Sequence, residues 1–524
     1  MCGIVGYAGN IETACGKPLE VCLQGLERLE YRGYDSAGVA LTAPGMDKVV
    51  VRKKAGRLKN LVEDIERKPM PLATVGIGHT RWATNGEPSD VNAHPHTSMD
   101  GKVAIIHNGI IENASQLRLD LQAEGYRFAS ATDTEVAAKL LGKIVDKIIA
   151  DEGKPDLFKA VRRMARMLEG AFTILATDCR QPDIVVGARH DSPLVVGLGE
   201  GENFLGSDVA AFVAYTKRAM EVDQDQAVCV SADKVIVTDF DGNVVENPKT
   251  YTVDWDASAA EKGGWDSFMD KEIHEDPAAV QRTLLGRFDA NGGITLDEVR
   301  IDEHDFKAID KIIVVACGTA SYAGQVAKYA IEHWVRIPVE IELAHEFRYR
   351  DPILTPRTLV VAISQSGETM DTLMALRHAR EQGSKVLAIC NTQGASIPRE
   401  SDAVLYTHAG PEVAVASTKA FVAQITAAYL LGLYLAQVKG AMFRDEIHQM
   451  LDSLKDMPRK IQWVLDTQPK TIQAAAERMV NANSFLFLGR HVGYPVALEG
   501  ALKLKEIAYT FTEGFAAGEL KHGP

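Results

Sequence analysis

Cys2 is the residue in this chain whose type and position most suggest catalysis. Its small size permits an aminopeptidase to remove Met1, after which the mature chain begins at Cys2. That residue then carries a thiol and a free α-amine, whose ordinary pKa of about 7.7–8.0 leaves a useful fraction neutral and basic near pH 7. A neighbouring base turns a thiol into a strong nucleophile, and an N-terminal amine can be that base. A buried cysteine in a first strand would look the same in the sequence.

The loop from Gly78 to Gly86 carries side chains suited to an amino-acid ligand. Its flanking glycines give it hinges, and Arg81 offers a planar fork of donors that fits a carboxylate. A surface salt bridge beside an exposed Trp82 would explain the same residues. This loop alone does not decide between the two interpretations.

Two later segments are also open to two interpretations. A strand over 103–106 runs into Asn108-Gly109, and Asn-Gly is a strong hairpin-turn signal. The same pair can present a side-chain amide and a backbone N–H to a developing oxyanion. Farther on, Thr132 and Glu135 have the spacing of a helix-capping box. Asp133, between them, could instead hold the α-amine of an amino-acid ligand.

The elements around these residues differ between the two halves of the chain. The first half consists of short, β-rich segments broken by glycines, with helices between them. The second half alternates buried strands with helices, which is the signature of an α/β domain with a parallel sheet. Between them, from about 241 to 290, the pattern loosens and predicts a linker.

Two strands of the second half, over 311–316 and 359–363, open into loops of small hydroxyl residues and glycine before a helix. Such turns aim N–H and O–H donors at an anion near the helix N-terminus. Two of them, with a third helix starting after 415–419, predict a phosphate ligand. No P-loop signature or dinucleotide fingerprint occurs. The candidate binding residues are Cys317, Gly318, Thr319, Ser364, Gln365, Ser366, Thr369, Val415 and Ser417.

Composition excludes several classes of protein. The net charge of −14, without a long basic run, argues against a nucleic-acid-binding face. The seven cysteines are scattered, with no C-x-x-C pair and no zinc-ligand spacing, so reduced thiols and no metal are expected. We find neither a signal peptide nor an apolar run approaching 18 residues, which predicts a cytoplasmic protein without a membrane partner.

Five motifs occur in an order that resembles one family. They are Cys2-Gly-Ile-Val-Gly, Tyr31-Arg-Gly-Tyr-Asp-Ser-Ala-Gly, His79-Thr-Arg-Trp-Ala-Thr, His107-Asn-Gly-Ile-Ile-Glu-Asn and Thr132-Asp-Thr-Glu. Together they are similar to the N-terminal-nucleophile glutaminase domain of the glutamine–fructose-6-phosphate aminotransferases. The resemblance implies that Cys2 is the nucleophile and that Asn108 and Gly109 form the oxyanion hole. It also implies that Arg81 and Asp133 hold the carboxylate and amine of glutamine. Trp82 would gate the ammonia path, and Thr84 would lie in the substrate loop.

The second half is similar to paired sugar-isomerase domains. Its first strand, loop and helix have a weak echo near the end of the chain, in which Glu346 corresponds to Glu519. There, Glu499, Lys503 and Glu506 are spaced to share one helix face, as a solvated salt-bridged face would also be. The family pattern makes Glu506 the base that moves a sugar proton. Lys503 and His522 would then lie near the sugar.

The chain departs from this pattern at three places. Asn85 stands where close relatives often carry histidine, and Ala320 stands where relatives commonly have a serine in the first phosphate loop. The sequence ends at Pro524, partway through the second copy. In the family, further strands follow, and then a tail whose lysine forms a Schiff base with the sugar. We therefore expect residues 1–524 alone to hydrolyse glutamine but to make little glucosamine 6-phosphate.

The expected fold is an α+β N-terminal-nucleophile hydrolase with αββα layers, followed by α/β sugar-isomerase domains with parallel sheets. The expected domains are 2–240 for the glutaminase, 241–290 for the linker, 291–450 for the first isomerase domain and 451–524 for the start of the second. The predicted reaction converts glutamine and fructose 6-phosphate to glutamate and glucosamine 6-phosphate, without a metal or organic cofactor, in a homodimer. Two alternatives are a regulatory protein that binds phosphosugars and a glutaminase with another ammonia acceptor.

Overall fold

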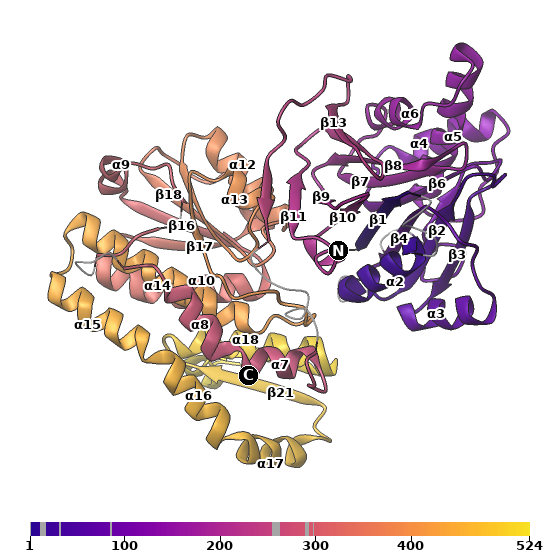
Figure 1. Ribbon diagram of the computed structural model, residues 1–524. Helices are drawn as coiled ribbons and strands as arrows, with labels where there is room; N and C mark the ends of the chain where they lie inside the picture. Colours follow the sequence, from indigo (N-terminus) through magenta and orange to yellow (C-terminus); the bar gives the residue numbers. More distant parts are fainter. Residues whose placement is uncertain are drawn as a thin grey trace. The chain divides into compact units, whose positions relative to one another are not determined.

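The structure, a computed structural model, describes residues 2–10, 17–30, 33–83, 86–253, 262–288, 293–296 and 298–523 (Figure 1). It divides into two compact units, Met1–Glu261 and Lys262–Pro524.

The first unit is built on two antiparallel sheets. Its strands are β1 (Gly3–Gly9), β2 (Ser36–Thr42), β3 (Val50–Ala55), β4 (Val75–Arg81), β5 (His96–Thr97), β6 (Val103–Gly109), β7 (Phe172–Asp178), β8 (Gln181–His190), β9 (Val195–Leu198), β10 (Glu202–Gly206), β11 (Arg218–Glu221), β12 (Gln226–Val230), β13 (Val235–Asp239) and β14 (Thr250–Thr252). One sheet has the order β14-β11-β9-β10-β1-β4-β2-β3, and the other has the order β13-β12-β8-β7-β6-β5.

Helices cover the outer faces of these sheets. The helices α2 (Lys17–Leu29) and α3 (Leu58–Arg67) pack on the first sheet, whereas α4 (Ala114–Ala123), α5 (Asp133–Glu152) and α6 (Leu157–Ala165) pack on the second. Strand alternation separates the layers. In β1, Ile4 and Ala8 lie in the core shared by the two sheets, while Val5 and Tyr7 face the helices. The predicted αββα arrangement is therefore confirmed.

The second unit contains the predicted parallel sheet. Its strands are β15 (Glu298–Val299), β16 (Lys311–Ala316), β17 (Val339–Leu343), β18 (Thr358–Ser364), β19 (Lys385–Cys390) and β20 (Ala403–Tyr406). Their order is β15-β20-β19-β18-β16-β17, and all pairs are parallel except the pairing of β15 with β20. Because β16 and β18 are parallel neighbours, their carboxyl ends lie at the same edge of the sheet.

Both faces of this sheet are covered by helices, as its uninterrupted apolar strands require. Residues of α10 (Gly318–Val335), α14 (Lys419–Lys439) and α15 (Arg444–Lys455) pack in the core of one face, together with α8 (Asp276–Leu284) and α9 (Glu303–Ala308). Residues of α11 (Ala344–Phe347), α12 (Met370–Glu381) and α13 (Ser396–Glu400) pack on the other face.

The end of the chain repeats the start of this sheet. After α16 (Met457–Thr467) and α17 (Pro469–Met479) come β21 (Ser484–Gly489), α18 (Gly493–Ala508), β22 (Phe511–Ala516) and the short helix η4 (Ala517–Lys521). Strands β21 and β22 are parallel and joined through α18, as β16 and β17 are joined through α10. A short helix follows in each copy, so the structure contains the repeat that the sequence predicted.

Two features differ from expectation. The segment 241–290 contributes to both units, because β14 pairs with β11 in the first, while α7 (Phe268–His274) and α8 belong to the second. A strand as short as β14 is too brief to show alternation. The sequence analysis also overlooked the uncharged run over 420–438. The helix that contains it, α14, is the one helix among the described residues that is long and apolar enough to cross a membrane. However, 67% of its apolar window is buried inside the fold.

Candidate functional site

Three strand ends meet in the first unit, and alternation decides which side chains they present. Cys2 precedes β1, where Gly3 pairs with Thr80 near the end of β4. Ile4 and Ala8 of β1, like Val75 and Ile77 of β4 and Ala104 and Ile106 of β6, face the layer between the sheets. Side chains two residues farther along each strand face the same way. Cys2, His79, Arg81 and Asn108 therefore converge between the two sheets.

Cys2 is held by hydrogen bonds from two sides. The backbone N–H of Trp82 donates to Cys2 Sγ over 3.2 Å, and the Asn108 side-chain amide donates from Nδ2 to the Cys2 carbonyl over 2.8 Å. Burial raises the pKa of the Cys2 thiol, although the Trp82 N–H opposes this shift. The resting thiol is therefore protonated near pH 7, and it needs a base before it can act as a nucleophile.

Asn108-Gly109 ends a strand and does not form a hairpin turn. Strand β6 lies between β5 and β7 in the sheet, and Gly109 pairs with Phe172 of β7. Gly109 has φ of +116°, and a Cβ there would lie 2.0 Å from the carbonyl oxygen of Ala171. Only glycine fits this position. The strand end thus presents the Asn108 amide beside Cys2.

Arg81 and Asp133 are buried charges of opposite sign. Arg81 donates from Nη2 to the Gly86 carbonyl over 3.1 Å. Burial lowers the pKa of Arg81, but the nearby Cys2 and Asp133 oppose that shift. The Asp133 carboxylate accepts the backbone N–H of Ile111 at Oδ2 and that of Thr134 at Oδ1, each over 3.0 Å. One cation and one anion near the thiol suit the two charges of a free amino acid.

The residues that follow Arg81 in the predicted loop contact Tyr34 and Asp35. Trp82 is 43% exposed, and its ring meets Tyr34 edge-on with centroids 5.6 Å apart. The backbone N–H of Ala83 donates to Asp35 Oδ2 over 2.8 Å. Thr84 was predicted to lie in the substrate loop, and Asn85 was noted as a departure from the family pattern. Both lie outside the described residues.

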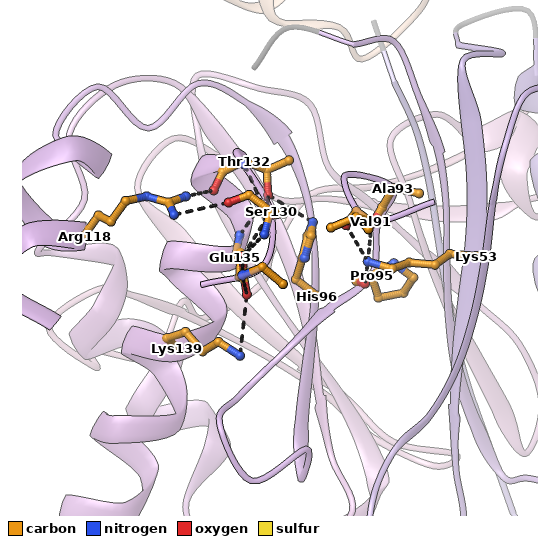
Figure 2. Close-up of polar contacts among 11 residues, drawn as sticks. Lys53, Val91, Ala93, Pro95, His96, Arg118, Ser130, Thr132, Glu135 and Lys139 are labelled. Atoms are coloured by element: carbon orange, nitrogen blue, oxygen red, sulfur yellow. Dashed lines mark hydrogen bonds and ion pairs between the residues drawn. The ribbon is translucent and has the colours of Figure 1, made fainter. Parts of the chain in front are cut away.

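A polar scaffold fixes the start of α5, and with it Asp133 (Figure 2). Thr132 caps the helix by accepting the Glu135 N–H, and its hydroxyl also meets His96 Nε2 over 3.0 Å. Glu135 does not complete a capping box. Its carboxylate instead accepts the backbone N–H groups of Ala129 and Ser130, which lowers its pKa against the opposing effect of burial. Arg118 donates hydrogen bonds from Nη1 and Nη2 to the carbonyls of Ser130 and Thr132.

In the second unit, the two predicted phosphate loops lie at adjacent carboxyl strand ends. Cys317, Gly318 and Thr319 follow β16, with Cys317 in the N-cap position of α10. Ser364, at the end of β18, meets Thr369 Oγ1 over 2.9 Å, and its hydroxyl accepts the Gly367 N–H over 3.0 Å. Gln365 and Ser366 lie in the same loop. Ala320, the predicted departure, lies in the first turn of α10 and packs in the core.

Two carboxylates, Glu272 (buried) and Glu412 (half-buried), shape the third predicted loop, before α14. Glu272 of α7 accepts the backbone N–H groups of Val413 and Ala414, over 2.6 and 2.9 Å. Glu412 accepts the Ser417 hydroxyl over 3.1 Å, and burial raises its pKa. The side chain of Val415 is 63% exposed. Sequence reasoning did not assign Glu272 or Glu412 to this loop, because their hydrogen bonds to its backbone N–H groups and hydroxyls form only in the folded chain.

The predicted face of α18 reaches the first phosphate loop. Thr319 donates from its hydroxyl to Glu499 Oε1 over 3.0 Å and accepts from Lys503 Nζ over 3.1 Å. Lys503 also pairs with Glu506 over 2.8 Å. This face is therefore not merely a solvated row of charges. Burial raises the pKa of Glu499. Within the described residues, no hydrogen bond or ion pair joins His522 to this group, and His522 is exposed.

Comparisons with known proteins agree with this division. A glutamine amidotransferase domain matches residues 79–214, and a SIS domain matches residues 306–434. The glutamine–fructose-6-phosphate aminotransferase [isomerizing] of Corynebacterium efficiens is 63% identical over the whole chain, which covers 83% of that relative. The protein of the same name from Streptomyces coelicolor is 59% identical, with the same coverage.

Among solved structures, the C-terminal domain of glucosamine-fructose-6-phosphate aminotransferase from Francisella tularensis matches 50% of this chain and 73% of its own. The identity is 40% and the TM-score is 0.49. The identity of the curated relatives extends across both units and their linking segment. The chain belongs to the family of isomerizing glutamine–fructose-6-phosphate aminotransferases.

Proposed function

We propose that the first unit hydrolyses the side-chain amide of glutamine and that the second uses the ammonia to convert fructose 6-phosphate to glucosamine 6-phosphate. The observation that carries the glutaminase assignment is the position of Cys2, whose Sγ and carbonyl bond to Trp82 and Asn108. A thiol, an amide donor and a buried Arg–Asp pair provide the groups that amide hydrolysis of an amino acid needs.

In the first reaction, the α-amine of the processed N-terminus takes the thiol proton, directly or through water. The thiolate attacks Cδ of glutamine, and the oxyanion is held by Asn108 Nδ2–H and the Gly109 N–H. One such donor is worth about 2.7–4 kcal/mol in the transition state. The protonated amine returns its proton to the leaving nitrogen, so ammonia departs and a thioester remains. Water then attacks the thioester, which releases glutamate and restores the thiol.

Arg81 and Asp133 bind the α-carboxylate and α-amine of glutamine in this proposal. Both side chains are at least nine-tenths buried, so a partner of opposite charge there is only weakly screened. Trp82, which is partly exposed and follows Arg81 directly, would close over the bound amino acid and the released ammonia. Thr84 is assigned to the same loop.

In the second reaction, the phosphate of fructose 6-phosphate accepts hydrogen bonds from the N–H and O–H groups of the loops at 317–319 and 364–369. Val415 and Ser417 lie beside these loops in the proposed site. Ammonia adds to C2 of the open-chain ketone and water leaves, which forms an imine. Glu506 removes a proton from C1, a proton is delivered to C2, and the C1 hydroxyl proton passes to the nitrogen, which gives the 2-amino aldehyde. Lys503 Nζ lies 2.8 Å from the Glu506 carboxylate and would hold it in position beside the sugar. His522 is assigned to the sugar on the family pattern.

The test separates the two reactions. With both substrates, a protein that also carries the family's C-terminal strands and tail should form glutamate and glucosamine 6-phosphate in equal amounts, whereas residues 1–524 alone should form mainly glutamate. Cys2→Ala should abolish glutamine-dependent formation of both. Glu506→Gln, which removes only the base, should abolish glucosamine 6-phosphate while glutamate is still formed. Glutamate formation by Cys2→Ala, or unchanged sugar product from Glu506→Gln, would contradict the assignment.

We further propose a cytoplasmic homodimer. The family resemblance is the support for both properties, and light scattering of the purified protein would measure the oligomeric state.

A further inference from the structure

We infer that His79 is a positioning residue that sets which way the Asn108 amide points, and thereby aims its N–H groups at the reacting centre beside Cys2. The inference rests on the proposed role of Asn108 as an oxyanion donor, and it assigns a task to a residue that the proposed reaction does not otherwise use.

The first observation is the bond that His79 makes across the two sheets. His79 lies on β4 in one sheet, and its Nε2 is 3.0 Å from both the carbonyl oxygen of His107 and Oδ1 of Asn108 in the other sheet. Both partners are oxygen acceptors, so Nε2 must carry a proton and donate to them. His79 is fully buried, and its Nδ1 has no hydrogen-bond partner among the described residues.

The second observation is that this ring stays neutral. Burial, together with the nearby charges of His107 and Arg81, lowers the pKa of His79 to about 3, although its hydrogen bonds to Asn108 and to the His107 carbonyl oppose this shift. The single ring proton therefore remains on Nε2 throughout the neutral range. A fixed N–H donor is a stronger constraint on its partner than a group that changes its charge near pH 7.

This donor decides the orientation of an otherwise ambiguous side chain. The oxygen and nitrogen of an asparagine amide can exchange places by a half-turn. Only one orientation lets Oδ1 accept from His79 while Nδ2 donates to the Cys2 carbonyl over 2.8 Å. The reverse orientation would place two N–H groups against each other at His79 and two oxygens against each other at Cys2.

The consequence for catalysis concerns the second proton on Nδ2. One N–H is used at the Cys2 carbonyl, and the other has no partner among the described residues. That second N–H is available to the oxyanion that forms on the glutamine amide oxygen when the neighbouring Sγ attacks. Without His79, the amide can turn and present Oδ1 instead, which would repel the developing negative charge.

A double-mutant cycle tests this coupling. His79→Phe keeps a ring but removes the donor, and it should lower kcat for glutamine hydrolysis about 10-fold with KM changed less than about 2-fold. Asn108→Ala alone should cost more, on the order of 10²–10³. In the Asn108→Ala background, His79→Phe should add less than about a further 2-fold loss, because the amide that it orients is gone.

His94 supplies the matched control. Its ring lies against that of His79, with centroids 4.3 Å apart and a tilt of 36°, and it is similarly buried. Within the described residues, His94 makes no hydrogen bond to Asn108. His94→Phe should lower kcat by the same factor in the Asn108→Ala background as in the unmutated protein. His79→Gln, which keeps an N–H donor, should recover part of the activity that His79→Phe loses. Should His79→Phe not fold, His79→Leu takes its place in the cycle.

The outcomes separate this inference from the proposed function. If Asn108→Ala leaves kcat unchanged, the oxyanion role itself is wrong. If Asn108→Ala lowers kcat and His79→Phe still costs its full 10-fold in that background, His79 acts independently and the positioning role is wrong. The positioning role is also wrong if the kcat loss caused by His94→Phe disappears in the Asn108→Ala background as that of His79→Phe does. The coupling would then reflect packing and not the hydrogen bond.

Discussion

At the scale of single residues, Cys2 combines two properties that oppose each other. Its thiol lies where a Trp82 N–H can stabilise negative charge on sulfur, yet burial raises its pKa above the ordinary value. A group with a raised pKa holds its proton more tightly, so the thiolate fraction at pH 7 is smaller than for a free cysteine. The reaction therefore depends on a base, and in our proposal this is the α-amine of Cys2.

This dependence predicts a specific pH response. For the processed protein, kcat/KM for glutamine should rise with pH through the titration of the amine, near its ordinary pKa of about 7.7–8.0. A variant with an N-terminal extension that is not removed keeps the thiol but displaces the amine, and its rate should fall about 10²-fold or more. Stopped assays across pH 5.5–9 would measure this, with intact mass confirming each N-terminus.

Calorimetry provides the control for that variant, because the extension must not block the site. Glutamine should still bind to it with an affinity within a few-fold of that of the processed protein. An extended chain that binds glutamine and hydrolyses it at an undiminished rate would exclude the amine as the base.

At the scale of elements, the site depends on how the segment between β4 and β5 is anchored. Lys53 of β3 donates from Nζ to the carbonyls of Val91, Ala93 and Pro95, over 3.1, 2.7 and 3.1 Å (Figure 2). This segment begins at Gly86, whose carbonyl accepts from Arg81, and it continues to His96, which meets Thr132 at the start of α5. One ammonium thus supports the surroundings of both Arg81 and Asp133.

We therefore expect Lys53→Met to disturb binding more than chemistry. The methionine stem fills similar space but leaves three carbonyls without their donor, so the first unit should lose about 2–4 kcal/mol of stability. KM for glutamine should rise while kcat changes little, because Arg81 binds and does not react. Urea unfolding and steady-state kinetics would measure the two effects.

The neighbouring Lys54 is the control for that substitution. It lies on the same strand, and its Nζ pairs with Asp90 at the surface over 2.7 Å. Exposed pairs of this kind contribute little, so Lys54→Met should leave stability and KM unchanged within error. Equal effects of Lys53→Met and Lys54→Met would mean that the three carbonyl contacts are unimportant.

At the scale of the whole molecule, the sequence predicted the parts whose signals are local. The strand before Asn108, the loops after β16 and β18, and the candidate residues Cys2, Arg81 and Asn108 all follow from short motifs. The segment 78–81 was predicted as part of a loop with glycine hinges, but it is the end of the buried strand β4. Contacts between distant elements were not predictable. His79 meets Asn108 only because two sheets stack, and Thr319 meets Glu499 only because α18 packs beside α10. The short β14 and the buried α14 show the same limit, since sheet pairing and burial are properties of the folded chain.

The central claim, that Cys2 is the nucleophile, can be tested across the whole chain at once. The chain has seven cysteines, and burial raises the pKa of Cys22, Cys229 and Cys390 to about 12. In our proposal, only Cys2 combines an adjacent base with a bound amino acid. A glutamine analogue that carries an electrophile at the amide position should accordingly form one adduct per chain, on the peptide that begins with Cys2. Glutamine should protect against it, and Cys2→Ala should abolish it. Peptide mass spectrometry makes the measurement, and an adduct on any other cysteine, or one that persists in Cys2→Ala, would contradict the account.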